Sequence, residues 1–304
     1  MNNPKVSIIT MIYNNEQFVD TAVASILEQD YPHIEVIIRD DGSRSFHPER
    51  IRSLFDGAED RLEGLIIEQS PSNMGTVNNF NSAIALATGE IIIPLSCDDS
   101  FLDSTTVSQI VDTFRRTGCL ICSARRKSRQ TGELAPDMAT VDAFLAEPDR
   151  RFARLCYSNF ISGATVYYSR QILEQLGCFD TRFRLLEDYP FLLQTVLAGI
   201  EIAFMEQPTI VYNEGGISQK QKKSKVHPLL QQDFKLVYEL VIFPNEQQLP
   251  KKMQRYLRYR YLRQYGSSGI FQKLWDGIRF ADVAGMLLIW KLTGKTDRFG
   301  ALME

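Results

Sequence analysis

Apolar runs alternate with amphipathic stretches through the first hundred residues of the chain. Runs rich in Val and Ile occupy residues 6–12, 34–39, 65–68 and 91–95. Between them, apolar residues recur every three or four positions, the spacing of one helical face. An alternation of strands and helices in this order is typical of a parallel, right-handed wound sheet. We therefore expect an α/β fold with a mostly parallel wound sheet flanked by helices.

The apolar run at residues 91–95 is followed shortly by two adjacent acids, Asp98 and Asp99. A continuous apolar run predicts a strand buried on both faces. Ligands of open parallel sheets bind beyond the carboxyl ends of the strands, so both acids should face the ligand. Capping of the helix that begins after Ser104 would explain an isolated acidic pair equally well. Pro94 cannot donate to a sheet ladder, so we expect the strand to leave the sheet there.

Two other strands of the first half also end in polar tips. The first runs into Tyr13-Asn14 and the second into Asp40-Asp41. In a parallel sheet these tips and the acidic pair share one edge, which creates an acid-lined crevice. Carboxylates without a nearby histidine favour a hard cation, Mg²⁺ or Mn²⁺, over zinc. The Asp-Asp-Gly-Ser sequence that starts at Asp40 is equally typical of a plain turn.

Composition narrows the class of protein. The 304 residues are 44% hydrophobic, enough for a substantial core, and a net charge of −3 argues against general nucleic-acid binding. The N-terminus lacks the apolar core of a signal peptide, and no stretch reaches the roughly 18 apolar residues of a transmembrane helix. We expect a cytoplasmic protein, or one at the inner membrane face.

The five cysteines do not form a metal or disulfide pattern. Cys119 and Cys122 make the single C-x-x-C sequence, and it falls in an expected strand at residues 120–124. Strand alternation would place these two side chains on opposite sides. We therefore expect buried structural thiols rather than a zinc site.

The second half of the chain is less regular. The Arg- and Lys-rich residues 125–133 are typical of an exposed hairpin or loop, and residues 135–150 show no strong pattern. Gly177 is expected to end one helix, and Glu187-Asp188 to open another that reaches about Leu197. Further strands are expected at residues 161–168, 202–205 and 209–212.

The pattern divides the chain near position 215. Residues 1–215 should form the main domain, and residues 216–304 a polar loop followed by a helical C-terminal region. Arginines and tyrosines alternate between residues 255 and 263. Packing of these helices onto the main domain is the simplest interpretation, and contact with an anionic membrane or a lipid-linked molecule is the alternative. The polar loop contains a cluster of lysines that forms either an exposed surface or a cover for a diphosphate. These lysines are Lys220, Lys222, Lys223 and Lys225.

Missing motifs restrict the ligand of the crevice. There is no G-x-G-x-x-G after the first strand, which disfavours a dinucleotide oxidoreductase, and no P-loop sequence. An acid-lined crevice without a glycine-rich phosphate loop suggests that a divalent metal carries the phosphate charge. A nucleotide diphosphate is the simplest ligand of this kind.

Short motifs follow one another in a defined order along the first two thirds of the chain. They are Val6–Thr10 with Tyr13-Asn14, Ser25–Gln29, Asp40–Ser43, Asn73–Gly75, Ala87–Ile92, the pair Asp98-Asp99 in the place of a D-x-D sequence, Gly177–Asp180 and Glu187-Asp188. Each motif alone is weak. Together, in this order and spacing over roughly residues 4–215, they resemble the family 2 glycosyltransferases of the A-type nucleotide-sugar fold.

The resemblance implies a role for each acidic tip. Asp41 would accept a hydrogen bond from the imide N–H of uracil or thymine, and Tyr13 would lie against the base. Asp98 would hold the ribose or metal region, and Asp99 would coordinate the metal that bridges the diphosphate. Asp188 would be the catalytic base, although capping of its helix next to Pro190 is compatible with the same position. The remaining donor contacts implied are Thr10, Asn14, Asn73 and Gly75.

Two departures from the family pattern bear on function. Many relatives carry an arginine before the asparagine that follows the Asn-x-Gly segment, whereas Phe80-Asn81 stands here, so a basic donor contact is missing or comes from elsewhere. The Q-x-x-R-W sequence of processive polysaccharide synthases is also absent. Addition of a single sugar is therefore favoured over polymerisation.

The leading hypothesis is an inverting, metal-dependent glycosyltransferase. It would move a sugar from a UDP- or dTDP-sugar to a hydroxyl of a cell-surface glycan or lipid-linked precursor, with Mn²⁺ or Mg²⁺. Contact of the C-terminal helices with a membrane and formation of a homo-oligomer are further options, and nucleic acid is not an expected partner. The alternatives are an inactive nucleotide-sugar-binding module and a sugar-phosphate nucleotidyltransferase. A retained Asp99 and Asp188 argue against the inactive module.

Overall fold

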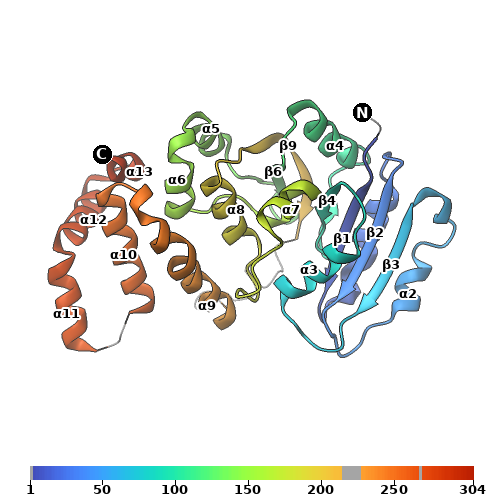
Figure 1. The fold of residues 1–304 in the computed structure, drawn as a ribbon, viewed down its shortest axis with the longest axis horizontal. Coiled ribbons are helices and arrows are strands. Elements are labelled where there is room, and N and C mark those ends of the chain that lie inside the picture. Colours follow the sequence, from blue (N-terminus) through green and yellow to red (C-terminus); the bar gives the residue numbers. More distant parts are fainter. Residues whose placement is uncertain (1–2, 214–226, 267–268) are drawn as a thin grey trace.

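A single mixed sheet organises the computed structural model, which describes residues 3–213, 227–266 and 269–304 (Figure 1). Within these residues the sheet order is β3-β2-β1-β4-β8-β6-β9-β5, and β7 pairs with β6. The strands are β1 (Val6–Ile12), β2 (Ile34–Asp40), β3 (Gly64–Gln69), β4 (Ile91–Pro94), β5 (Ser100–Phe101), β6 (Ile121–Ser128), β7 (Leu134–Ala135), β8 (Val166–Ser169) and β9 (Ile202–Tyr212). The lysines of the polar loop and the position of residue 215 lie outside the described residues.

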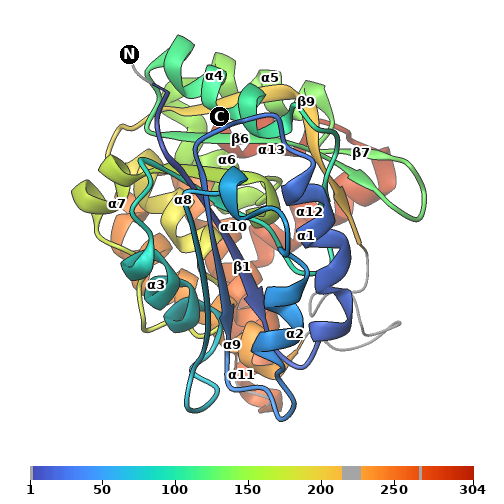
Figure 2. The same cartoon turned by 90° about the vertical axis from the view of Figure 1, so that its right-hand side faces the viewer.

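Helices cover both faces of this sheet and form the C-terminal region. They are α1 (Val19–Leu27), α2 (Pro48–Ser53), α3 (Thr76–Leu86), α4 (Thr106–Thr117), α5 (Met138–Ala146), α6 (Arg151–Tyr157), α7 (Arg170–Leu176), α8 (Asp188–Leu197), α9 (Pro228–Val237), α10 (Lys251–Tyr265), α11 (Ile270–Arg279), α12 (Ala281–Thr293) and α13 (Arg298–Met303). Figure 2 shows α3 on one side of β1 and the pair α1 and α2 on the other. None of the described helices is long and apolar enough to cross a membrane.

The expected parallel sheet is confirmed in the first half of the chain. Strand β1 pairs in parallel with β2 and β4, and Val6 lies opposite Ile34 on one side and Ile91 on the other. Strand β4 ends at Pro94, as expected from its missing N–H group. Because these strands run in one direction, their carboxyl ends form one edge.

The second half of the sheet is mixed. Strands β6 and β9 are parallel to each other and share the direction of β1, but the short β8 runs antiparallel between β4 and β6. The strand expected at 161–168 is shortened to β8, which a single 3-10 turn precedes. The two strands expected at 202–212 are one strand, β9, whose pairing with β6 shifts register beyond Ala124. That irregularity explains why the apolar pattern is broken at Glu206-Gln207.

Several local expectations were wrong. Residues 135–150 contain α5 rather than an unpatterned connection, and α6 begins directly after them. The arginine-rich residues, by contrast, form the hairpin that was one of the two expectations there, because β6 extends to Ser128 and pairs antiparallel with β7. Cys119 precedes β6 and hydrogen-bonds to Cys122, so the two thiols do not face opposite sides. Burial is confirmed for Cys97, Cys122 and Cys156, whereas Cys119 is half-buried and Cys178 is exposed.

The C-terminal helices share one hydrophobic cluster with the sheet and with α3, α6 and α8. Arg260 on α10 is half-buried, and its guanidinium donates to the carbonyls of Tyr157 (2.6 Å) and Cys156 (2.8 Å) at the end of α6. Two neighbouring arginines also form ion pairs, Arg255 with Asp282 and Arg258 with Glu246. Packing is therefore the main role of the arginine- and tyrosine-rich helix.

Glu35 holds the amino ends of β1, β2 and β4 together. Its buried carboxylate accepts hydrogen bonds from Ser7 Oγ (2.5 Å) and from the Thr88 N–H (2.5 Å), and pairs with Lys5 (2.8 Å). A Cβ on Gly89 would lie 2.5 Å from Ser7 Oγ, which explains the glycine in this motif. Burial alone would raise the pKa of Glu35, but Lys5, Ser7 and Thr88 outweigh it and hold that pKa at about 2.

We expect Glu35→Gln to lower the free energy of unfolding by about 1.5–3 kcal/mol at neutral pH, because hydrogen bonds to a charged group are lost. The wild-type contribution is complete above the ordinary pKa of 4.5 and disappears as the pH falls toward 2. Urea denaturation at pH 7 and at pH 3 measures both effects. Glu63→Gln, on the exposed side of Lys5, serves as the control. An equal loss in both variants would contradict the special weight given to Glu35.

Candidate active site

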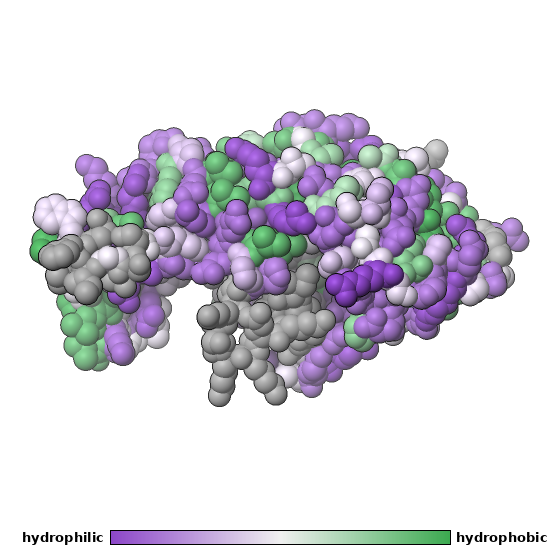
Figure 3. All heavy atoms as spheres, turned by 90° about the horizontal axis from the view of Figure 1, so that it is seen from below, coloured by the Kyte–Doolittle hydropathy of each residue, from purple (hydrophilic) through white to green (hydrophobic). Residues whose placement is uncertain are grey.

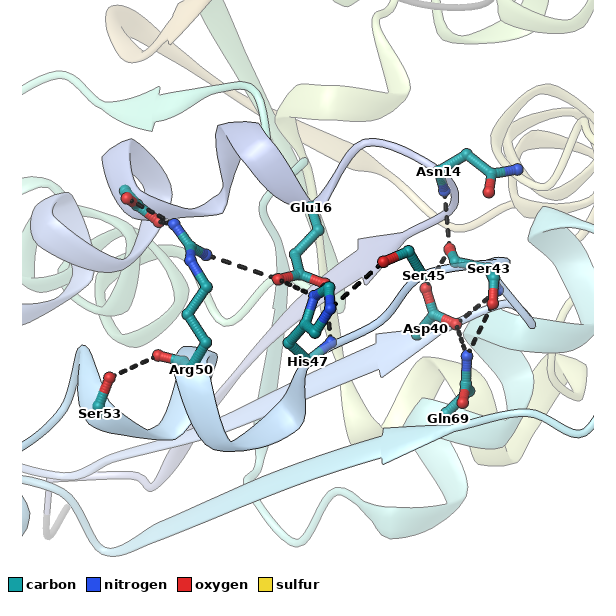
Figure 4. Close-up of polar contacts among 10 residues, drawn as sticks. Asn14, Glu16, Asp40, Ser43, Ser45, His47, Arg50, Ser53 and Gln69 are labelled. Atoms are coloured by element: carbon teal, nitrogen blue, oxygen red, sulfur yellow. Dashed lines mark hydrogen bonds and ion pairs between the residues drawn. The ribbon is translucent and has the colours of Figure 1, made fainter.

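Asp40 and Asp41 at the end of β2 have different partners, although they are adjacent. Asp40 is fully buried and accepts hydrogen bonds from the Ser43 N–H (2.7 Å) and from Gln69 Nε2 (3.0 Å), as Figure 4 shows. It therefore closes the turn between β2 and α2 and links that turn to the end of β3. The turn interpretation is confirmed for Asp40.

Asp41 binds the segment that leads into α3. Its carboxylate accepts hydrogen bonds from Asn73 Nδ2 (2.9 Å), the Met74 N–H (2.7 Å) and the Gly75 N–H (3.0 Å). Burial raises the pKa of Asp41, and these hydrogen bonds oppose the shift. A Cβ on Gly42 would lie 2.5 Å from the Ser72 carbonyl carbon, so only glycine allows this approach. Asp41, Asn73 and Gly75 are thus brought together as one unit.

The tip of β1 lies against this unit. Asn14 adopts a positive φ of 53°, and its N–H donates to Ser43 Oγ (2.7 Å) (Figure 4). The Tyr13 side chain is 45% exposed and therefore open to a flat ligand. Thr10, by contrast, is completely buried, and its hydroxyl has no hydrogen-bond partner among the described residues. No side-chain hydrogen bond within the described residues joins Thr10 to the Asp41 unit or to the acidic pair.

The acidic pair lies beyond β4, next to the tip of β1. The Cys97 thiol donates to the carbonyl of Asn15 (3.8 Å), which joins the two tips. Asp99 is buried; its Oδ1 accepts from the Asn213 N–H (2.7 Å), and its Oδ2 has no hydrogen-bond partner within the described chain. Asp98 is half-buried. Burial raises the pKa of Asp99 to about 7, and the neighbouring Asp98 adds to the shift.

Arg126 connects the acidic pair to the opposite side of the site. The sequence pattern predicted an exposed hairpin or loop here; Arg126 does lie in the hairpin strand β6, but it is half-buried. It donates to Ser162 Oγ (2.6 Å), and its guanidinium carbon lies 4.4 Å from the centre of the Tyr212 ring. Its charge also favours the ionised form of Asp99 and so lowers that pKa. Ser162 is next to the glycine that contacts Asp188.

Asp188 is the first residue of α8 and is half-buried. A Cβ on Gly163 would lie 2.6 Å from its Oδ2, so the backbone passes directly over the carboxylate. Burial raises the pKa of Asp188, although hydrogen bonds from the Tyr189 and Gly163 N–H groups oppose the shift. Burial and the charge of Asp188 also raise the pKa of Glu187. Two adjacent carboxyls in this setting cannot both ionise easily, so the pair shares a proton up to a higher pH than exposed carboxyls do.

Two residues of the site were missed from the sequence. Arg184 donates to Asn73 Oδ1 (2.7 Å), so a basic side chain stands beside the Asp41 unit after all. Asp233 on α9 is buried and accepts hydrogen bonds from the backbone of the segment just before Glu187. Neither lies in a recognisable motif. For Asp233, the sequence signal was an acidic residue within an otherwise apolar helical pattern.

Comparison with known proteins identifies the family. The family model described as glycosyl transferase family 2 matches residues 7–177, more than half of the chain, so the protein belongs to that family. A putative colanic acid biosynthesis glycosyl transferase (WcaA) of Escherichia coli is 28% identical over 204 residues, 64% of this chain and 67% of that protein. A putative teichuronic acid biosynthesis glycosyltransferase (TuaG) of Bacillus subtilis is 25% identical over 182 residues, 60% of this chain and 68% of that protein.

Solved structures share the fold. S. aureus TarS in complex with UDP-GlcNAc has a TM-score of 0.60 at 17% identity, with 87% of this chain and 73% of that chain covered. A mannosyltransferase of Pyrobaculum calidifontis in complex with GDP-Man and Mn²⁺ has a TM-score of 0.60 at 18% identity, with 95% and 81% covered. The A-type fold expected from the sequence is thereby confirmed. The chain spans less than half the length of some other curated glycosyltransferases that it matches: 33% of one from Nostoc and 49% of EpsH from Bacillus subtilis.

Proposed function

We propose that this chain is an active inverting glycosyltransferase that uses a UDP- or dTDP-sugar and adds a single sugar. The acceptor is a hydroxyl of a cell-surface glycan or a lipid-linked precursor, in keeping with relatives named for colanic and teichuronic acid biosynthesis. One observation carries the proposal. Contacts between neighbouring residues connect the unit around Asp41, the acidic pair and the backbone beside Asp188 at the strand-tip edge of the sheet.

The proposed mechanism assigns the proton transfer to Asp188. Inversion requires a base that removes the acceptor hydroxyl proton while its oxygen attacks the anomeric carbon. The Gly163 N–H and the close backbone fix the orientation of the Asp188 carboxylate. Its raised pKa makes it a stronger base than an exposed aspartate, provided that it is ionised. We assign the shared proton to Glu187, which leaves Asp188 ionised.

The acidic pair fits a divalent cation. Asp99 Oδ2 is buried without a partner in the described chain, and a second carboxylate, Asp98, stands beside it. Oxygen ligands of this kind suit Mg²⁺ or Mn²⁺. No group of three or more His, Cys, Asp or Glu side chains forms a cation site within the described residues, so diphosphate oxygens and water would complete the coordination. When bound, the cation would stabilise the diphosphate leaving group.

The nucleotide side of the proposal depends on Asp41 and Tyr13. Asp41→Ala should weaken UDP binding by about 10- to 100-fold, the range expected for a hydrogen bond to a charged group. Isothermal titration calorimetry measures the affinity. Asp40→Asn is the matched control, because Asp40 is completely buried and should affect stability rather than binding. Unchanged UDP affinity in Asp41→Ala would contradict the base contact.

The C-terminal helices present a surface that we propose contacts an anionic membrane. Five large apolar side chains on α11 and α12 are more than half exposed, and Figure 3 shows hydrophobic surface at this end of the molecule. Exposed Lys291 and Lys295 flank them without an ion pair to any described residue. Apolar and cationic side chains together are typical of interfacial helices. The apolar residues are Trp275, Ile278, Leu288, Ile289 and Leu292.

This surface predicts lipid-dependent sedimentation. The wild-type protein should pellet with vesicles containing phosphatidylglycerol and much less with pure phosphatidylcholine, because the lysines need anionic lipid. Leu288→Glu combined with Leu292→Glu should abolish pelleting, whereas Leu134→Glu, an exposed leucine on β7, should not. Binding that ignores both lipid charge and the double substitution would exclude this interface.

A donor panel tests the proposed function. The purified protein is incubated with UDP-, dTDP- and GDP-sugars and Mn²⁺, and release of free nucleotide diphosphate is followed over time. Slow release from one donor supports a transferase, since water can replace the acceptor. Tight binding without release in any mixture, acceptor extracts included, would indicate a binding module. Thermal stabilisation by a nucleoside triphosphate and a sugar phosphate, but not by any nucleotide sugar, would indicate a nucleotidyltransferase.

A further inference from the structure

Asp233 is a buried carboxylate that the proposed reaction does not use directly. It lies on α9, 2% exposed, and no cation is paired with it in the described chain. Its Oδ2 accepts from three consecutive backbone N–H groups, those of Arg184 (3.0 Å), Leu185 (2.6 Å) and Leu186 (3.1 Å), and its Oδ1 also accepts from the Arg184 N–H (3.1 Å). Burying a carboxylate is costly unless such hydrogen bonds compensate it. We infer from these three converging N–H groups that the Asp233 carboxylate fixes the position of residues 184–186.

The segment held by Asp233 joins the two halves of the site. Toward the nucleotide side, the Arg184 side chain donates to Asn73 Oδ1 (2.7 Å) and its carbonyl accepts from the Val77 N–H (3.2 Å) at the start of α3. Toward the base side, the chain continues from Leu186 through Glu187 into Asp188. A shift of the segment would therefore move the base relative to the donor.

We propose that Asp233 is a positioning residue that sets the distance between the donor-binding unit at Asp41 and the base Asp188. The proposal rests on the function assigned above. It makes α9, which follows the family-matched residues 7–177, a necessary part of the catalytic geometry. A displacement on the order of 1 Å between reacting groups can reduce the rate by about 10²-fold. Asp233 never touches the substrate in this scheme.

The test uses Asp233→Asn in the full chain, with the matched acid-to-amide variant Glu239→Gln as control. Glu239 follows α9 closely but pairs with Lys235 and Tyr261, away from this segment. In Asp233→Asn we expect kcat to fall on the order of 10²-fold with little change in donor KM or UDP affinity, because a neutral amide oxygen holds the three N–H groups more weakly than a carboxylate and its NH₂ group cannot accept from Arg184. Glu239→Gln should keep the wild-type kcat. A wild-type kcat in Asp233→Asn, or equal changes in kcat and donor affinity, would overturn the proposal.

Hydrogen exchange separates this proposal from the proposed function. The amides of residues 184–186 should exchange faster in Asp233→Asn than in the wild type and in Glu239→Gln, whether or not the protein has activity with the donors tried. An unchanged exchange rate would refute the holding role, whereas an inactive wild type would refute only the assigned function. Should Asp233→Asn fail to fold, Asp233→Glu decides the same question. Faster exchange of the amides of residues 184–186 together with a kcat below the wild-type value supports positioning, and a wild-type kcat despite the displaced carboxylate refutes it.

Discussion

Asp188→Asn is expected to slow sugar transfer by ~10²–10⁴, the usual weight of a general base, while donor binding stays intact. The amide keeps the shape of the side chain and its contact with the Gly163 N–H, but it cannot take the acceptor proton. Single-turnover transfer with saturating donor measures the chemical step, and calorimetry with UDP measures binding. Normal turnover in this variant would remove Asp188 from the mechanism.

Glu187→Gln is the matched control for this variant. Burial and the adjacent Asp188 raise the pKa of Glu187, so it is the carboxyl that we expect to hold the shared proton near neutral pH. A neutral glutamine should therefore be tolerated far better than an amide at position 188. If Glu187→Gln slowed transfer more than Asp188→Asn did, Glu187 would be the base.

The raised pKa of Asp188 also predicts a pH dependence. Transfer needs the ionised form, so kcat/KM should fall as the pH is lowered, and the fall should begin above the range of ordinary carboxyl groups. The apparent value belongs to the pair of acids rather than to one residue. A pH profile measured with one donor and one acceptor checks the position of this limb. A profile flat down to pH 4 would contradict the raised pKa.

Asp99→Asn is expected to reduce metal-stimulated donor hydrolysis by about 10²–10³-fold, because metal stabilisation of a leaving group supplies several kcal/mol. The variant keeps an oxygen for the Asn213 N–H but loses the charge of the buried carboxylate. Titration with Mn²⁺ in the presence of UDP, followed by electron paramagnetic resonance, measures the cation directly. Asp103→Asn, a nearby acid that caps the turn before α4, is the control.

Metal binding should also depend on pH in a defined direction. Burial raises the pKa of Asp99 to about 7, so a proton occupies the carboxylate below that value and competes with the cation. Mn²⁺ affinity should therefore rise between pH 6 and pH 8 in the wild type, and this rise should be absent in Asp99→Asn. A pH-independent affinity would mean that Asp99 is not a ligand.

The sequence was most informative where strands are long and consecutive. Apolar runs that end in Asn14, Asp41 and Asp99 predicted one shared edge, and the contacts between the tips of β1, β2 and β4 confirm it. Parallel strands linked by short helices allow few topologies, which is why the fold of the first half of the chain could be predicted from its sequence.

The other parts of the site depend on tertiary contacts between distant segments. Arg126 looked exposed because β6 continues beyond its apolar part, and only the pairing with β9 and the Ser162 hydroxyl reveal its position. Arg184 reaches Asn73 across more than a hundred residues, and Asp233 acts from a helix that carries no family motif. Thr10 is completely buried, and its donor contact stays a prediction, because strand alternation does not say which face of a doubly covered sheet is open.

Arg260 clasps two carbonyl groups at the end of α6 from a helix more than a hundred residues further along the chain. A chimera that joined residues 7–177 to the tail of another enzyme would lose both Arg260 hydrogen bonds and leave the two carbonyl groups without their donor. Attempts to change the substrate specificity of this protein should therefore replace surface loops and keep α10 unchanged, because α10 packs against the rest of the structure and supports it.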